Sequence, residues 1–226
     1  MRFADRSEAG RVLAGKLAAY AGRRDLLVLA LPRGGVPVAF EVARALRAPL
    51  DIFLVRKLGV PGHEELAMGA IASGGARFIN LDVVQQLGIP NSALDAATEL
   101  ARQELLRCEK AYRGNLPPQQ VAGRRIILVD DGIATGASVR AAVRGLRPQN
   151  PAGIVVAAPV ASAEARADLR TEADEVICAY VPERFAAVSL WYDNFSQTSD
   201  EEVRCLLETA QTTMIPESSK EQGNSL

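Results

Sequence analysis

Short runs of consecutive apolar residues alternate along this chain with stretches in which apolar residues recur every three or four positions. Short apolar runs are typical of strands buried on both faces of a sheet, and they lie at 26–31, 50–55, 125–129, 153–158 and 175–179. The helical periodicity predicts helices at 5–22, 37–47, 92–112, 138–146, 164–170 and from 199 onward. Because helices and strands alternate, we expect an α/β fold: a mainly parallel sheet with helices on both faces.

Three further segments do not follow this alternation. Gly59, Pro61 and Gly62 predict a loop at 58–66, and residues 67–72 and 77–79 are expected to form a small hairpin. Residues 212–226 are polar and aperiodic, which predicts a disordered tail after a domain at 1–211.

Composition narrows the class of protein. The 226 residues are 48% hydrophobic and 23% charged, which is ordinary for a globular chain, and the formal net charge is −1. This balance argues against nucleic acid and anionic membranes as partners. Three cysteines without a C-x-x-C pair, and the single histidine His63, argue against disulfides and a zinc site. With no apparent signal peptide and no membrane-spanning run, we expect a cytoplasmic protein.

The strongest chemical signal follows the apolar run at 125–129. Asp130 and Asp131 stand at its end, and a turn containing Gly132 and Gly136 then leads into a helix. Free N–H groups at a helix N-terminus favour anions, and carboxylates accept hydrogen bonds from sugar hydroxyls. The pattern therefore indicates a sugar-phosphate site, with an ordinary turn as the alternative. No lysine precedes Ser138, and no G-x-G-x-x-G is present, which excludes a Walker A loop and a dinucleotide fingerprint.

Residues 126–138 resemble the phosphoribosyl pyrophosphate signature of type I phosphoribosyltransferases. The resemblance implies that Asp130 and Asp131 hold the ribose hydroxyls and contact Mg²⁺, directly or through water. It also implies that residues 135–138 hold the 5′-phosphate, that 58–66 is a mobile loop, and that 180–198 forms a small hood over the base. Together with the cationic segments described next, the expected substrate-binding set is Arg33, Gly34, Gly35, Arg56, Lys57, Asp130, Asp131, Gly132, Ile133, Ala134, Thr135, Gly136, Ala137 and Ser138.

Two other strand ends carry cations. Residues 31–36 resemble the pyrophosphate loop of the family, with Arg33 as a forked cation and a non-proline cis peptide expected near Arg33–Gly34. Arg56 and Lys57 are predicted to end the strand at 50–55, where two adjacent cations suit pyrophosphate. The alternatives are a surface arginine in a glycine-rich turn and a solvated charge pair.

Other residues leave alternatives open. His63 is either an aid to the leaving group or a plain surface histidine, and Arg113 either reaches a phosphate or only favours a helix end. Four aromatic residues are hood candidates, although part of the set is expected to be core: Phe185, Trp191, Tyr192 and Phe195. Ala134 departs from the 6-oxopurine branch of the family, which has an aspartate there.

The expected function is transfer of a 5-phosphoribosyl group from phosphoribosyl pyrophosphate to an unidentified base or small acceptor. Asp130, Asp131, Arg33 and Lys57 are the expected catalytic residues, Mg²⁺ the expected cofactor, and a homodimer a possible assembly. The alternative is a non-catalytic sensor of phosphoribosyl pyrophosphate or a nucleotide on the same fold.

Overall fold

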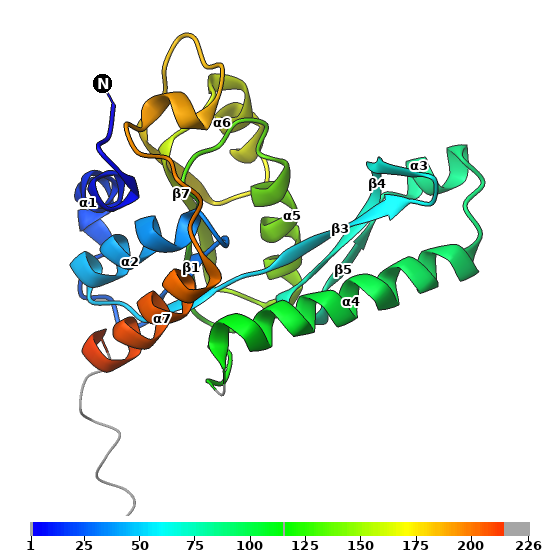
Figure 1. Ribbon diagram of the computed structural model, residues 1–226, viewed down its shortest axis with the longest axis horizontal. Helices are drawn as coiled ribbons and strands as arrows, with labels where there is room; N and C mark the ends of the chain where they lie inside the picture. The colour runs from blue at the N-terminus through cyan, green and yellow to red at the C-terminus, as the bar shows by residue number, and fades with distance from the viewer. Residues whose placement is uncertain (1, 115, 215–226) are drawn as a thin grey trace, which may run out of the picture.

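The computed structural model describes residues 2–114 and 116–214, which form two sheets and their covering helices (Figure 1). The first sheet has five strands in the order β2-β1-β6-β7-β8, and every neighbouring pair in it is parallel. Its strands are β1 (Leu26–Ala30), β2 (Leu50–Ile52), β6 (Arg125–Val129), β7 (Gly153–Val160) and β8 (Glu175–Tyr180). The alternation of strands and helices along the sequence thus produces the expected α/β fold.

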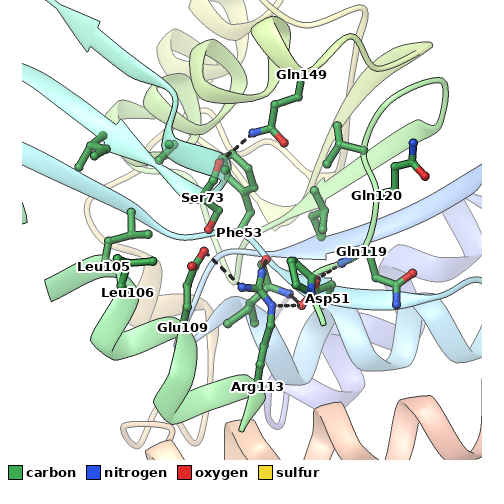
Figure 2. A pocket seen from close by; sticks show the side chains of 18 of the residues that line it. Asp51, Phe53, Ser73, Leu105, Leu106, Glu109, Arg113, Gln119, Gln120 and Gln149 are labelled. Carbon is green, nitrogen blue, oxygen red and sulfur yellow. Dashed lines mark hydrogen bonds and ion pairs between the residues drawn. The ribbon is translucent and has the colours of Figure 1, made fainter. Parts of the chain in front are cut away.

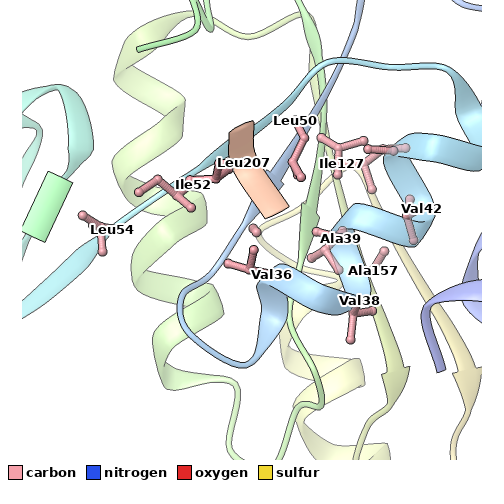
Figure 3. Packing of buried hydrophobic residues seen from close by; sticks show 14 of the residues in the cluster. Val36, Val38, Ala39, Val42, Leu50, Ile52, Leu54, Ile127, Ala157 and Leu207 are labelled. Carbon is pink, nitrogen blue, oxygen red and sulfur yellow. The ribbon is translucent and has the colours of Figure 1, made fainter. Parts of the chain in front are cut away.

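Helices cover both faces of this sheet. Side chains alternate between the faces of a strand, so Val28 packs into a cluster with one set of helices while Leu29 packs into another. The first set is α1 (Arg6–Lys16), α2 (Gly35–Leu46) and α7 (Asp200–Met214), and the second is α5 (Ala137–Leu146) and α6 (Ala163–Leu169). Figure 3 shows the apolar side of α2 packed on the sheet, with Leu207 of α7 beside it.

The order of the strands creates a switch point. From β1 the chain passes through α2 to β2 on one side, and from β6 it passes through α5 to β7 on the other side. In open parallel sheets, ligands bind at such a point, outside the carboxyl ends of the strands. The loops after β1 and β6 therefore lie where a ligand site is expected.

The second sheet belongs to an arm that projects from this body (Figure 1). It is antiparallel and consists of β3 (Val55–Val60), β4 (His63–Ala72) and β5 (Arg77–Ile79), followed by α3 (Leu81–Gln86) and the long α4 (Asn91–Arg113). Leu58, Val60 and Met68 of the arm are buried, in one cluster with Leu94 and Leu105 of α4. The short 3₁₀ segments are Ala18–Tyr20, Ser73–Gly75, Arg147–Gln149 and Val188–Trp191.

The arm corrects two expectations about secondary structure. Most of 58–66 lies in β3 and β4, not in a loop, because alternate apolar residues of β3 pack on α4. Arg56 and Lys57 do not end a parallel strand, since β2 stops at Ile52 and both cations lie in β3. The hairpin predicted across 73–75 is present as β4 and β5.

The C-terminal helix is longer than expected. Ser199 accepts a hydrogen bond from the N–H of Glu202 at 3.1 Å and so caps α7 as predicted. The helix continues to Met214, so residues 212–214 are helical and not part of a disordered tail. The rest of the predicted tail, 215–226, lies outside the described residues. Within the described residues, none of the helices combines the length and the apolar character that crossing a bilayer requires.

Candidate active site

The loops after β1 and β6 meet in close contact. A Cβ atom added to Gly34 would lie 2.0 Å from Oδ2 of Asp131, and one added to Gly35 would lie 2.8 Å from the carbonyl oxygen of Val129. Glycine is thus the residue that lets the two loops approach this closely. The peptide bond Pro32–Arg33 is cis, one residue before the expected position. The structure therefore brings together the two segments that the sequence singled out most strongly.

Asp130 and Asp131 form a half-buried acid pair at the end of β6. The N–H of Asp131 donates to Oδ1 of Asp130 at 2.9 Å. Burial and the neighbouring carboxylate of Asp131 raise the pKa of Asp130 well above its usual value, and burial also raises the pKa of Asp131 despite a nearby guanidinium. Hydrogen bonds or a cation supplied by a ligand would stabilise the ionised pair.

The nearby guanidinium belongs to Arg6, the first residue of α1, which sequence reasoning missed. Its Nε donates to Oδ2 of Asp131 at 2.8 Å, and the two side chains are only 11% and 15% exposed. The same guanidinium donates to the carbonyl of Ser196 at 2.7 Å and lies 4.0 Å from the ring centre of Phe195. Nothing local in the sequence identifies Arg6, because its partner is 125 positions away along the chain.

The turn between β6 and α5 is fixed by the start of α6. The N–H of Ser162 donates to the carbonyl of Ile133 at 2.9 Å, and the hydroxyl of Ser162 donates to the carbonyl of Ala134 at 2.7 Å. Gly136 precedes α5 with φ at +72°, a left-handed conformation that glycine adopts without strain. Among the described residues, the N–H groups of Thr135 and Gly136 donate to no acceptor. With the N-terminus of α5, they form the kind of cradle that binds a phosphate.

The predicted cations lie on two sides of this site. Arg33 pairs with Asp200 of α7 at 3.3 Å, and the hydroxyl of Tyr112 donates to the same carboxylate at 3.2 Å. Arg56 pairs with Glu104 of α4 at 3.0 Å, whereas Lys57 is exposed. A cavity of about 840 Å³ is lined by Arg56 and Lys57 together with Ala137 and Ser138 of the cradle, along one side of α4. Lys57 thus lines the same cavity as Ser138 even though it lies on the arm.

The segment 180–198 packs against the turn that follows β6. Val188 packs so closely on Gly132 that an added Cβ would lie 2.4 Å from its Cγ1. Tyr192 is buried against Phe3, and its hydroxyl donates to the carbonyl of Asp131 at 2.5 Å. Burial raises the pKa of Tyr192. Tyr192 is therefore a core residue that holds the backbone of Asp131, while the ring centres of Trp191 and Tyr180 lie 5.2 Å apart.

The structure also gives the positions of His63 and Arg113, for which the sequence left two roles open. His63 is exposed at the start of β4. Arg113 is buried in the last turn of α4, where its Nε donates to Asp51 at 2.8 Å and a terminal nitrogen donates to the carbonyl of Ile52 at 2.9 Å. Arg113 therefore ties α4 to the edge strand β2 and does not face the turn 130–138.

The parallel sheet, with the loops after β1 and β6 in contact at its switch point, can be compared with known protein families. The profile of the phosphoribosyl transferase domain matches residues 5–192, so the chain belongs to that family. This confirms the family resemblance of the signature.

Individual relatives are also similar to this chain. A Mycobacterium tuberculosis protein named "Putative phosphoribosyl transferase Rv0571c" is 46% identical over 208 residues, which are 92% of this chain and 47% of that protein. The crystal structure of TT1426 from Thermus thermophilus has 43% identity and a TM-score of 0.82, covering 92% of this chain and 98% of that one. The chain spans about half the length of the curated relatives it matches.

Proposed function

We propose that the chain transfers a 5-phosphoribosyl group from phosphoribosyl pyrophosphate to a nitrogen of a small acceptor. The bond from the ribose C1 to the pyrophosphate oxygen breaks with its electron pair leaving on pyrophosphate, and a C1–N bond forms. The proton lost by the acceptor nitrogen passes to the released pyrophosphate or to water. The observation that carries the proposal is the contact between Gly34 and Asp131, which joins an acid pair to a glycine loop at the sheet's switch point.

The proposed roles follow from charge and position. Residues 135–138 hold the 5′-phosphate through N–H groups and the hydroxyls of Thr135 and Ser138. Asp130 and Asp131 accept hydrogen bonds from the ribose hydroxyls and favour the positive charge that develops at C1. The loop 33–35 and Lys57 neutralise the pyrophosphate as it leaves.

The acid pair also suits Mg²⁺. Among the described residues, no group of three or more His, Cys, Asp or Glu side chains could hold a metal ion by itself. Mg²⁺ usually binds one or two carboxylates together with substrate phosphates and water, so a pair of aspartates beside a pyrophosphate fits it. Asp130 and Asp131 would hold the ion, directly or through water, and the ion would neutralise charge on pyrophosphate.

The first test is calorimetry of phosphoribosyl pyrophosphate binding in Mg²⁺. The Asp130→Asn, Asp131→Asn double variant should bind at least about tenfold more weakly, since each charge-assisted hydrogen bond contributes about 1.5–3 kcal/mol. Asp82→Asn with Asp95→Asn, on the arm, makes the same change in charge and should bind normally. Unchanged affinity in a folded Asp130, Asp131 variant would refute the proposed roles of this pair.

A second measurement separates an enzyme from a sensor. The wild-type chain is incubated with phosphoribosyl pyrophosphate, Mg²⁺ and a panel of purine and pyrimidine bases, and the release of pyrophosphate is followed. Base-dependent release supports transfer. Tight binding without release for any base would instead favour a non-catalytic sensor on the same fold.

A further inference from the structure

A second cavity of about 570 Å³ lies where the arm meets the body (Figure 2). Its walls come from α4, the end of β2, the arm's 3₁₀ turn Ser73–Gly75, the segment 118–122 and Gln149. None of its lining residues belongs to the loop 33–35 or the turn 130–138. The cavity is therefore separate from the candidate active site.

The charged groups of this cavity already have partners of opposite charge. Asp51 accepts from Arg113 at 2.8 Å and from the N–H of Gln119 at 2.9 Å, and Arg113 also pairs with Glu109 at 3.2 Å. Arg102, whose side chain is half exposed, makes two hydrogen bonds of 2.8 Å to Glu99. Since both lining cations already have carboxylate partners, their charge is largely neutralised, and the cavity attracts a phosphate or carboxylate ligand less than unpaired cations would.

The remaining walls combine apolar surface with uncharged polar groups. Phe53, Leu105 and Val121 are buried at the cavity, and Leu106 is 47% exposed. Gln149 donates through Nε2 to the carbonyls of Ser73 and Gly145, which leaves its Oε1 as an acceptor. The side-chain amides of Gln119 and Gln120 make no hydrogen bond to any other described residue, so each offers a donor and an acceptor.

We propose that this cavity binds an uncharged planar heterocycle with donors and acceptors on its edge, as a nucleobase or its nucleoside has. Apolar walls and carboxamides suit the faces and the edges of such a molecule, and the paired charges disfavour a phosphorylated one. Cavities of roughly 300–1,000 Å³ are the usual size for small ligands. The site goes beyond the proposed transfer reaction and does not depend on it.

The test is calorimetry on the full chain, with adenosine, guanosine, cytidine and uridine as probes, each compared with its 5′-monophosphate. With excess phosphoribosyl pyrophosphate and Mg²⁺ present to occupy the candidate active site, we expect saturable binding of at least one nucleoside and weaker binding of its monophosphate. Leu106→Trp fills the cavity and should weaken the affinity at least tenfold. Leu81→Trp is the matched control, because Leu81 is 62% exposed on α3 and does not line the cavity.

A polar variant and a competition experiment complete the design. Gln119→Leu with Gln120→Leu keeps the backbone N–H that holds Asp51 and should weaken binding about two- to tenfold for each hydrogen bond lost. Nucleoside binding should persist when phosphoribosyl pyrophosphate occupies the candidate active site, which places the ligand away from that site. No binding by any of the four probes would overturn the proposal. So would undiminished binding in folded Leu106→Trp, loss of nucleoside binding when phosphoribosyl pyrophosphate is present, or, in its presence, a monophosphate that binds as tightly as its nucleoside.

Discussion

Gly34→Ala tests whether the contact between the two loops is required. Gly34 has φ −59° and ψ −33°, an ordinary helical conformation that alanine adopts without strain. The added Cβ would nevertheless lie 2.0 Å from Oδ2 and 2.7 Å from Cγ of Asp131, and 3.3 Å from Nε of Arg6. The effect of this variant is therefore steric and falls on the ion pair between Asp131 and Arg6.

The size of the effect follows from that geometry. Overpacking of this kind costs about 1–3 kcal/mol in the free energy of unfolding. If the carboxylate of Asp131 moves away, the proposed site also loses a charge-assisted hydrogen bond to the ligand, which contributes about 1.5–3 kcal/mol. Binding of phosphoribosyl pyrophosphate should then weaken about 10- to 150-fold.

The assay pairs chemical denaturation with calorimetry of phosphoribosyl pyrophosphate in Mg²⁺. Gly15→Ala is the control, because Gly15 lies in α1 and an added Cβ there meets no atom within 4 Å. Alanine favours a helix over glycine by up to about 1 kcal/mol, so this control should be as stable as wild type or more so, with unchanged binding. If Gly34→Ala matches Gly15→Ala in its affinity for phosphoribosyl pyrophosphate and in its free energy of unfolding, the close contact between Gly34 and Asp131 is not required and the prediction is wrong.

Three more predictions concern the acid pair, the buried ion pair and the acceptor. Because folding raises the pKa of Asp130, the folded state binds more protons than the unfolded state at pH values between the unfolded and the folded pKa of this residue. The stability that protonated Asp130 contributes is therefore lost as the pH rises above about 4, the ordinary pKa of an aspartate. Asp130→Asn should remove this loss, so the Tm of the variant should rise relative to that of the wild type as the pH increases from about 4 toward neutral. Curves of Tm against pH that stay parallel for the two proteins would contradict this prediction. Arg113→Met should cost about 3–5 kcal/mol in urea unfolding, because it leaves Asp51 buried without its partner, and adding Asp51→Leu should recover part of that loss; no recovery would argue against the pair. Since Ala134 lacks a carboxylate, pyrophosphate release should be slow with hypoxanthine and guanine, and rapid turnover of either would refute the acceptor argument.

The parallel sheet and the core of the candidate site could be predicted because their signals are local. The continuous apolar run at 125–129 is typical of a strand with both faces buried, and it forms β6. The two aspartates that follow it therefore lie at the carboxyl end of this strand. The glycines of 33–35 and 132–136 likewise mark turns that a chain can adopt from its own residues.

Other features arise only when distant segments pack together. The run 50–55 looked like one strand, yet Leu54 pairs with Ser73 of the arm, and Arg56 and Lys57 leave the body with β3. Arg6 meets Asp131 across 125 positions of the chain. Periodicity reports which face of an element is buried but not what covers it. The partners of the charged and aromatic side chains were therefore decided by the tertiary structure alone.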